Sequence, residues 1–208
     1  MISRQFRPAF ADFVVRNCVR GALGALGVAI FFASFFPAHA IANEAALWKA
    51  LRSPGHFALI RHALAPGTGD PEGFRIGDCG TQRNLSDAGR TQARNIGVRL
   101  RENGIRAATV FSSQWCRCLE TARLLGLGHV EELAFLNSFF ARAEDGDPQD
   151  RALRQWLANR NLGRPTILVT HQVNITALSG IYPASGEIVV VGKSNSGELL
   201  VLGSIKTD

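Results

Sequence analysis

Short apolar runs of strand length, separated by helical stretches, constrain the fold of this sequence most. Such runs occupy residues 56–60, 107–113, 165–170, 187–192 and 198–205. Helical patterns cover residues 43–55, 85–104, 115–126, 152–163 and 172–180. Strands that alternate with helices are typical of domains in which a largely parallel sheet is covered by helices on both faces. We therefore predict an α/β fold with a mostly parallel central sheet.

The clearest helix, at 85–104, follows a long loop. Ser86 is placed as its N-cap, Ala93, Ile96 and Leu100 share one face, and Gly104 can supply the left-handed position at its end. The preceding residues 65–84 are rich in Gly and Pro and predict a loop. A loop of this length in a small domain is usually functional.

Cationic side chains follow three of the predicted strands. Arg61 and His62 follow the first, Arg117 comes shortly after the second, and His171 follows the third. Each alone is compatible with a structural role, such as a surface ion pair or a hydrogen-bonded histidine. In α/β folds, however, ligands bind outside the carboxyl ends of the strands, where these side chains would converge. Mutual repulsion disfavours such a cluster without an anion, so we predict an anion-binding site.

The first forty residues have the layout of a secretory signal peptide. Four arginines precede the apolar run at 21–36, and Ala38 and Ala40 are placed as an A-x-A cleavage site. The alternative is an uncleaved membrane anchor, because residues 21–40 are almost long enough to span a bilayer. Pro37 and His39 favour cleavage. We expect a secreted or periplasmic protein that contacts a membrane only if this leader stays attached.

Charge and cysteine content narrow the possible partners. Removing residues 1–40, which carry four arginines and one aspartate, lowers the formal net charge from +6 to +3. This balance is weak support for nucleic-acid binding, and no nucleic-acid partner is expected. In an oxidising compartment, Cys79 can pair with either Cys116 or Cys118, which leaves one thiol unpaired. The Cys-Arg-Cys spacing is not that of a metal-ligand pair, so no metal site is expected.

Four motifs together resemble a known family. LIRHA at 59–63, LSDAGRTQA at 85–93, SSQWCRCLETA at 112–122 and VTHQ at 169–172 are similar in content and order to the histidine phosphatase superfamily. An Arg-His pair alone would be a weak signal, whereas the ordered set is specific. The resemblance covers most of residues 57–179. It implies the phosphoglycerate mutase-like fold, a three-layer αβα sandwich, as a single domain over 41–208, and a phosphatase that needs neither metal nor cofactor.

The resemblance also implies roles for individual residues. His62 would be the nucleophile that becomes phosphorylated, while Arg61, Arg117 and His171 would hold the phosphoryl oxygens. Positioned cations suit phosphoryl transfer because charge spreads over the equatorial oxygens, and arginine offers a rigid fork that stays charged. A cation about 4 Å from an imidazole disfavours its protonation by up to ~4 kcal/mol at an effective dielectric constant of about 20. The arginines would therefore also keep His62 neutral.

Two departures from the family pattern concern the acid and the residue after the second histidine. Many members place a glutamate general acid after a Leu-Asn pair, and Ser138 stands at that place in FLNSFF. Gln172 stands where members often have glycine. Carboxylates that could substitute for the acid are equally compatible with solvated surface charges; they are Glu131, Glu132, Asp145 and Asp147. The general acid therefore stays unassigned.

Arg83, on the loop that leads into the helix at 85–104, is a further candidate for binding an anionic group of the substrate. An exposed loop arginine is an equally good interpretation.

The function predicted from these residues is an exported phosphatase that hydrolyses small-molecule phosphomonoesters through phospho-His62. The alternative is a catalytically silent protein of the same fold that binds a phosphorylated ligand. Ser138 favours the silent protein, and the intact pair of His62 and His171 favours the enzyme.

Overall fold

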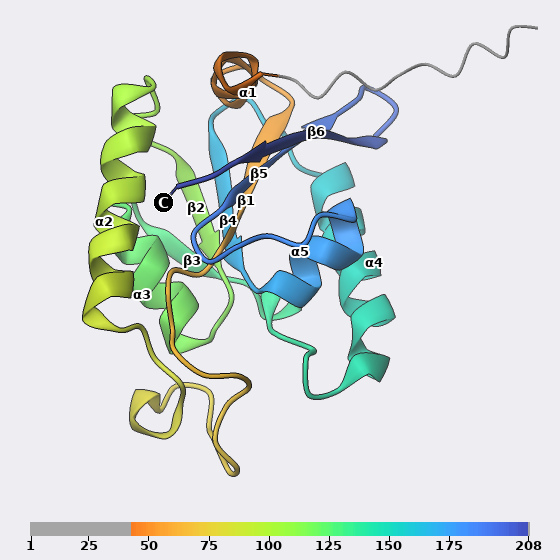
Figure 1. Cartoon of the computed structure of the whole chain (residues 1–208). Helices are drawn as coiled ribbons and strands as arrows, with labels where there is room; N and C mark the ends of the chain where they lie inside the picture. Colours follow the sequence, from red (N-terminus) through yellow and green to blue (C-terminus); the bar gives the residue numbers. More distant parts are fainter. Residues whose placement is uncertain (1–42, 208) are drawn as a thin grey trace, which may run out of the picture. The chain divides into compact units, whose positions relative to one another are not determined.

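A six-stranded sheet forms the centre of the computed structural model, which describes residues 43–207 (Figure 1). Its strands are β1 (His56–Arg61), β2 (Thr109–Ser112), β3 (Val130–Glu132), β4 (Thr166–Thr170), β5 (Ile188–Lys193) and β6 (Leu199–Ile205). They lie in the order β3-β2-β4-β1-β5-β6; the first four are parallel, and β5 and β6 are antiparallel to their neighbours. The predicted α/β fold with a mostly parallel sheet is confirmed. The signal peptide expected at 1–40 lies outside the described residues.

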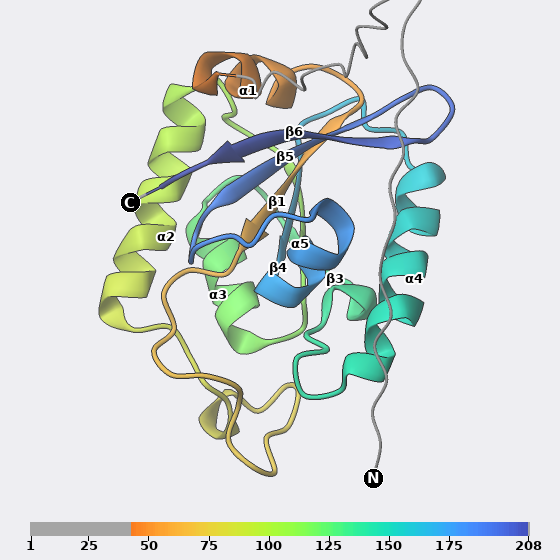
Figure 2. The same ribbon diagram turned by 45° about the vertical axis from the view of Figure 1, so that its right-hand side comes forward.

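Helices cover both faces of the sheet (Figures 1 and 2). One face packs against α1 (Glu44–Leu51), α2 (Asp87–Glu102) and α3 (Cys116–Leu124), and the other against α4 (Gly146–Ala158) and α5 (Gln172–Ser179). Side chains alternate along each strand, so Ala58 and Ile60 join the first core while Phe57 and Leu59 join the second. Because these strands are buried on both faces, they are continuous apolar runs in the sequence. The sheet and the two layers of helices form a three-layer sandwich.

The strand register brings the ends of β1, β2 and β4 together. Arg61, the last residue of β1, pairs with Thr170, the last residue of β4, and Ser112 at the end of β2 pairs with Val169. The backbone N–H of His62 continues the ladder by donating to the Thr170 carbonyl at 3.0 Å. The residues directly after the three strands therefore meet at one edge of the sheet.

Helix α2 fixes the chain as it leaves β1. Ser86 caps the helix by accepting a hydrogen bond from the Gly89 N–H. Gly89 itself lies against Leu64, where an added Cβ would come within 2.0 Å of the Leu64 carbonyl oxygen. The Gln92 amide accepts from the Leu64 N–H at 3.0 Å and donates to the Ser185 carbonyl at 2.9 Å. The Gly and Gln of LSDAGRTQA thus hold two site-forming loops in place.

The long loop at 65–84 is tied to the start of α3. A disulfide joins Cys79 to Cys116, which decides between the two pairings left open by the sequence, and Cys118 is free and buried. The Gln82 side chain accepts from the Cys116 N–H at 2.9 Å and donates to the Arg75 carbonyl at 2.7 Å. These links hold an otherwise irregular loop over the carboxyl ends of the strands.

Two elements differ from the sequence-based expectation. Helix α4 begins at Gly146, six residues before the predicted start at 152. Pro148 falls in its first turn, where backbone N–H groups have no intrahelical partner and proline is tolerated. Strand β3 was not predicted, because only one of its three residues is apolar; Glu131 and Glu132 are exposed on this edge strand. No helix among residues 43–207 is long and apolar enough to cross a membrane.

Candidate active site

A cavity of about 730 Å³ lies at the carboxyl ends of the strands. Its lining includes all five residues singled out from the sequence, which are Arg61, His62, Arg83, Arg117 and His171. The first two lie at the end of β1, Arg117 lies in the first turn of α3, and His171 is the residue before α5. The predicted convergence is therefore present, while the catalytic and binding roles stay predictions.

His62 is held with one ring nitrogen available. Its Nδ1 lies 2.8 Å from the Ala63 carbonyl oxygen, so Nδ1 carries the proton and Nε2 has a free lone pair. Burial lowers the pKa of His62 to about 3, and the charge of Arg117 adds to this effect. Burial, rather than the arginines named in the sequence-based interpretation, is thus the larger cause. The imidazole is neutral at any ordinary pH, as a nucleophile must be.

His171 is oriented by a chain of polar side chains. Its Nε2 lies 2.9 Å from Ser113 Oγ, which in turn donates to Asn137 Oδ1 at 3.2 Å. Since Asn137 Oδ1 can only accept, Ser113 accepts from His171 Nε2–H, and His171 Nδ1 faces the Nη2 of Arg117 at 3.5 Å. Burial, followed by the neighbouring His62 and Arg117, lowers the pKa of His171 well below its usual value. The two histidine rings meet edge to face, with 5.5 Å between centroids.

Arg117 is anchored by Asp70, a residue that the sequence analysis did not select. The Asp70 carboxylate accepts from Nη1 at 2.7 Å and from Nη2 at 3.0 Å, and it also accepts from the Trp115 indole at 3.0 Å. Burial acts to raise the pKa of Asp70, but the hydrogen bonds and charge of Arg117 outweigh it and hold that pKa below its usual value. Asp70 is therefore ionised and occupies the end of the guanidinium.

One N–H of the Arg117 guanidinium remains available for a ligand. Its Nε–H is buried and has no hydrogen-bond partner within residues 43–207, whereas Nη2 lies within reach of both Asp70 and His171 Nδ1. The Nε–H can donate to an oxygen of a phosphoryl group. By accepting from Nη1 and Nη2, Asp70 fixes the orientation of the Arg117 guanidinium and offsets part of its positive charge.

Arg61, Arg83 and the exposed Arg142 complete the cationic lining. Arg61 donates through Nη1 to the Pro183 carbonyl at 2.9 Å, while its buried Nε–H is unpartnered among the described residues. Arg83 donates to the carbonyls of Gly69 and Ala65 and is half-buried. Burial, with the charge of Arg117 as a further cause, lowers the pKa of the Arg61 and Arg83 side chains. Arg83 is thus part of the cavity wall rather than a fully exposed loop arginine.

The four carboxylates considered as substitutes for the missing acid are not among the residues that line the cavity. Ser138 does line it, and its hydroxyl accepts from the Phe140 N–H at 3.3 Å. The carboxylates in the lining are Asp70, which is bound to Arg117, and the exposed Glu72.

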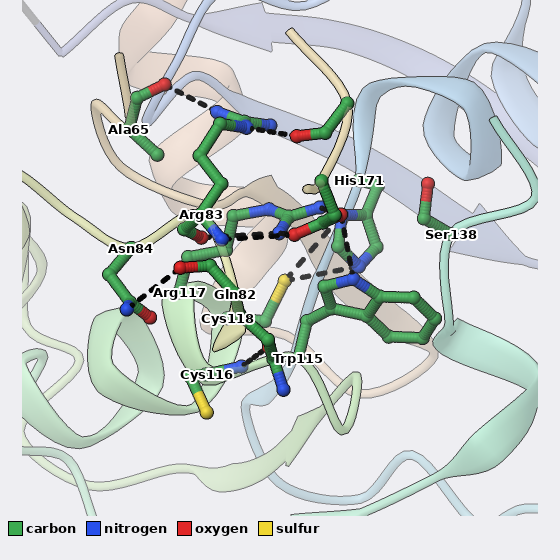
Figure 3. Close-up of polar contacts among 12 residues, drawn as sticks. Ala65, Gln82, Arg83, Asn84, Trp115, Cys116, Arg117, Cys118, Ser138 and His171 are labelled. Carbon is green, nitrogen blue, oxygen red and sulfur yellow. Dashed lines mark hydrogen bonds and ion pairs between the residues drawn. The ribbon is translucent and has the colours of Figure 1, made fainter. Parts of the chain in front are cut away.

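Cys118 lies beside His171, with Sγ 3.4 Å from Nε2 (Figure 3). Burial raises the pKa of its thiol to about 12, so it stays protonated and is not a competing nucleophile.

Sequence reasoning missed Asp70, Ser113 and Asn137. Ser113 and Asn137 lie inside quoted segments, directly after β2 and directly before Ser138, so their place next to site elements was a usable signal. Asp70 lies on an irregular loop whose path the sequence does not indicate. Among the described residues, no three His, Cys, Asp or Glu side chains form a group that could hold a metal ion.

Comparisons with known proteins agree with this geometry. Residues 57–139 match the sequence model of the histidine phosphatase superfamily (branch 1). Over 74 residues, 36% of this chain, the sequence is 38% identical to the serine/threonine-protein phosphatase Pgam5, mitochondrial, of Drosophila virilis. The match spans 23% of that protein's length.

Two solved structures have a similar fold. The protein histidine phosphatase SixA complexed with tungstate matches 73% of this chain and 97% of its own, with a TM-score of 0.52 and 17% identity. A mutant phosphoserine phosphatase from Entamoeba histolytica in complex with phosphoserine matches 74% of this chain and 98% of its own, with a TM-score of 0.55 and 17% identity. Residues 57–139 are thus similar in sequence to the histidine phosphatase superfamily, and the fold of the chain is similar to those of these two phosphatases.

Proposed function

We propose that this protein is an exported phosphatase that hydrolyses phosphomonoesters through a phosphohistidine at His62. The observation that carries the proposal is a neutral imidazole whose free Nε2 lies in a cavity that Arg61, Arg83 and Arg117 also line. Arg61 and Arg117 each hold a buried N–H group that has no partner among the described residues. An unpaired buried donor is costly, so these groups favour an anionic ligand. The match of residues 57–139 to the histidine phosphatase superfamily supports phosphatase chemistry.

In the first step, the lone pair of His62 Nε2 attacks phosphorus, and the ester P–O bond breaks with its electrons leaving on the alcohol oxygen. Arg61 and Arg117 stabilise the charge on the equatorial oxygens. In the second step, water attacks phosphorus and displaces the histidine nitrogen, which gives inorganic phosphate and regenerates His62. The proton released by the water neutralises the departed oxyanion, so atoms and charges balance. No step draws on a metal ion.

Export is supported by the leader pattern at 1–40 and by the Cys79–Cys116 disulfide, which is typical of oxidising compartments. Fractionation of cells that express the full chain tests this part: the protein should be found outside the cytoplasm, with an intact mass that lacks residues 1–40. Retention of Met1 on exported protein would instead indicate an anchored form.

The activity is tested with p-nitrophenyl phosphate, in the presence and absence of EDTA. We expect EDTA-resistant turnover that is lost in His62→Ala and kept in His129→Ala, which removes an exposed histidine remote from the motifs. A rapidly quenched reaction with labelled substrate should carry acid-labile phosphate on His62. Normal turnover by His62→Ala would refute the phosphohistidine route.

A silent phosphate-binding protein is the second candidate, because Ser138 lines the cavity at the place where a general acid is expected. It predicts binding of inorganic phosphate, detected by calorimetry, without turnover of any ester. Arg117→Ala would then weaken phosphate binding. His62→Ala would not change turnover, because the unchanged protein would show none.

A further inference from the structure

Large apolar side chains are exposed at the mouth of the phosphate cavity. In the part of the chain that the structure describes, six such side chains are exposed; they are Leu64, Ile76, Val98, Phe140, Tyr182 and Leu200. Three of the six, Ile76, Phe140 and Tyr182, line this one cavity. Isolated exposed apolar residues need no explanation, but residues from three separate segments that gather at one cavity indicate a binding surface.

The aromatic lining continues inward from this rim. Phe74 and Trp115 also line the cavity, with 5.4 Å between their ring centroids, and Trp115 packs edge to face on His171. The cavity therefore has a cationic floor and an apolar, largely aromatic wall. At about 730 Å³ it has room for a group much larger than phosphate.

The acid needed to protonate a poor leaving group is not evident in this wall. Asp70 is ionised and both of its oxygens accept from Arg117, so it has no proton to give. Ser138 is a hydroxyl and Glu72 is an exposed side chain on the rim. An aliphatic alkoxide, whose conjugate acid has a pKa of about 16 like water, leaves slowly without such help. A phenolate, with a pKa of about 10, does not need it.

We propose that the substrates of this site are aryl phosphomonoesters, in which the phosphoryl group is bonded to a phenolic oxygen and the aromatic body packs on Phe140, Tyr182 and Ile76. This inference rests on the proposed phosphatase function. His62 Nε2 forms the new bond to phosphorus while the aryl P–O bond breaks, and the phenolate leaves with the electron pair. The proton released when water hydrolyses phospho-His62 then neutralises it. A small polar sugar phosphate would leave the apolar wall uncovered and would require the absent acid.

Four substrates separate the two parts of this proposal when the exported, oxidised protein is assayed. Phenyl phosphate has an aromatic body and a phenolate leaving group; 2-phenylethyl phosphate keeps the ring but leaves as an alkoxide. 2-Naphthyl phosphate enlarges the ring, and glycerol 2-phosphate lacks both features. We expect kcat for phenyl phosphate to exceed that for 2-phenylethyl phosphate by about 10²-fold or more, the scale of general acid catalysis. KM should fall from glycerol 2-phosphate through phenyl to naphthyl phosphate.

Variants then assign the aromatic wall. Phe140→Ala and Tyr182→Ala should each raise KM for naphthyl phosphate by about tenfold, the scale expected for a partly buried aromatic contact. The inhibition constant for inorganic phosphate, which lacks an aromatic body, should change little in the same variants. Tyr182→Phe keeps the ring and should raise KM less than Tyr182→Ala. Leu200→Ala, which removes an exposed apolar side chain from β6, is the matched control and should not change KM.

The outcomes separate this inference from the function on which it rests. No turnover of any ester by protein that binds phosphate would refute the phosphatase itself. Turnover with equal kcat for phenyl and 2-phenylethyl phosphate, or with lower KM for glycerol 2-phosphate, would leave the phosphatase standing and overturn the aryl specificity. A selective loss of 2-phenylethyl phosphate turnover in Glu72→Gln would identify that carboxyl as an acid and would also overturn it.

Discussion

Burial of His62 should make the protein less stable on mild acidification. His62 is 3% exposed, and burial, followed by the charge of Arg117, lowers its pKa to about 3. In the unfolded chain a histidine has a pKa of about 6.5. Between these values the unfolded chain binds a proton that the native chain does not, so the free energy of unfolding falls as pH falls from about 6.5 towards 3. Above pH 7 both states are neutral and the effect is absent.

The magnitude at pH 5 is set by the unfolded-state pKa, because the native pKa lies well below that pH. A gap of about 1.5 pH units corresponds to about 2 kcal/mol. Urea denaturation of the unchanged protein and of His62→Gln, each at pH 7 and pH 5, measures it. The unchanged protein should lose about 2 kcal/mol more than the variant, which is about 4–8 °C in Tm for a chain of this size. Groups common to both proteins cancel in this comparison.

His129→Gln is the matched control, since it removes an exposed histidine and should respond to pH like the unchanged protein. An equal loss of stability in the unchanged protein and in His62→Gln would mean that native His62 takes up a proton freely. That result would refute the burial argument and, with it, the reasoning that holds this nucleophile neutral.

Two further changes test the supports of the site. Asp70→Asn leaves a buried arginine without its anion and should lower the free energy of unfolding by about 3 kcal/mol, measured by urea denaturation. The control is Asp87→Asn, which breaks an exposed ion pair and should lower it by less than about 1 kcal/mol. Equally small losses in both variants would contradict the role of Asp70. Replacing Cys79 and Cys116 together by Ser opens a link across 37 residues and should cost up to about 4 kcal/mol. Reductant should lower the stability of the unchanged protein but not of this variant.

The apolar strands and the cations at their ends could be predicted because their signals are local. Four or five consecutive apolar residues specify a strand buried on both faces, and a parallel sheet then brings the residues after each strand to one edge. His62 and His171 needed only this rule. The start of helix α4 was predicted six residues too late because Gly146, Asp147 and Pro148 resemble a turn, although all three are compatible with a first helical turn.

The position of Asp70 could not be predicted, because it depends on how a loop without periodicity is folded. That path depends in turn on the disulfide. Cys116 and Cys118 are two residues apart on α3 and so point to different sides of the helix. Cys116 pairs with the loop, whereas Cys118 faces the core beside His171. Sequence spacing alone does not say which side faces the loop, so the pairing and the Asp70–Arg117 contact had to come from the three-dimensional structure.

Charge accounting explains how so cationic a site can fold without its ligand. Burial keeps His62 and His171 neutral, so the fixed charges of the lining are four arginines, Asp70 and Glu72. Their sum is two positive charges, which a phosphomonoester dianion neutralises. If either histidine were protonated as well, the repulsion would rise and the nucleophile would be lost. The same burial that makes the folded protein sensitive to acid therefore prepares the site for a dianion. Asp70 limits the repulsion and leaves the Nε–H of Arg117 free for a phosphoryl oxygen.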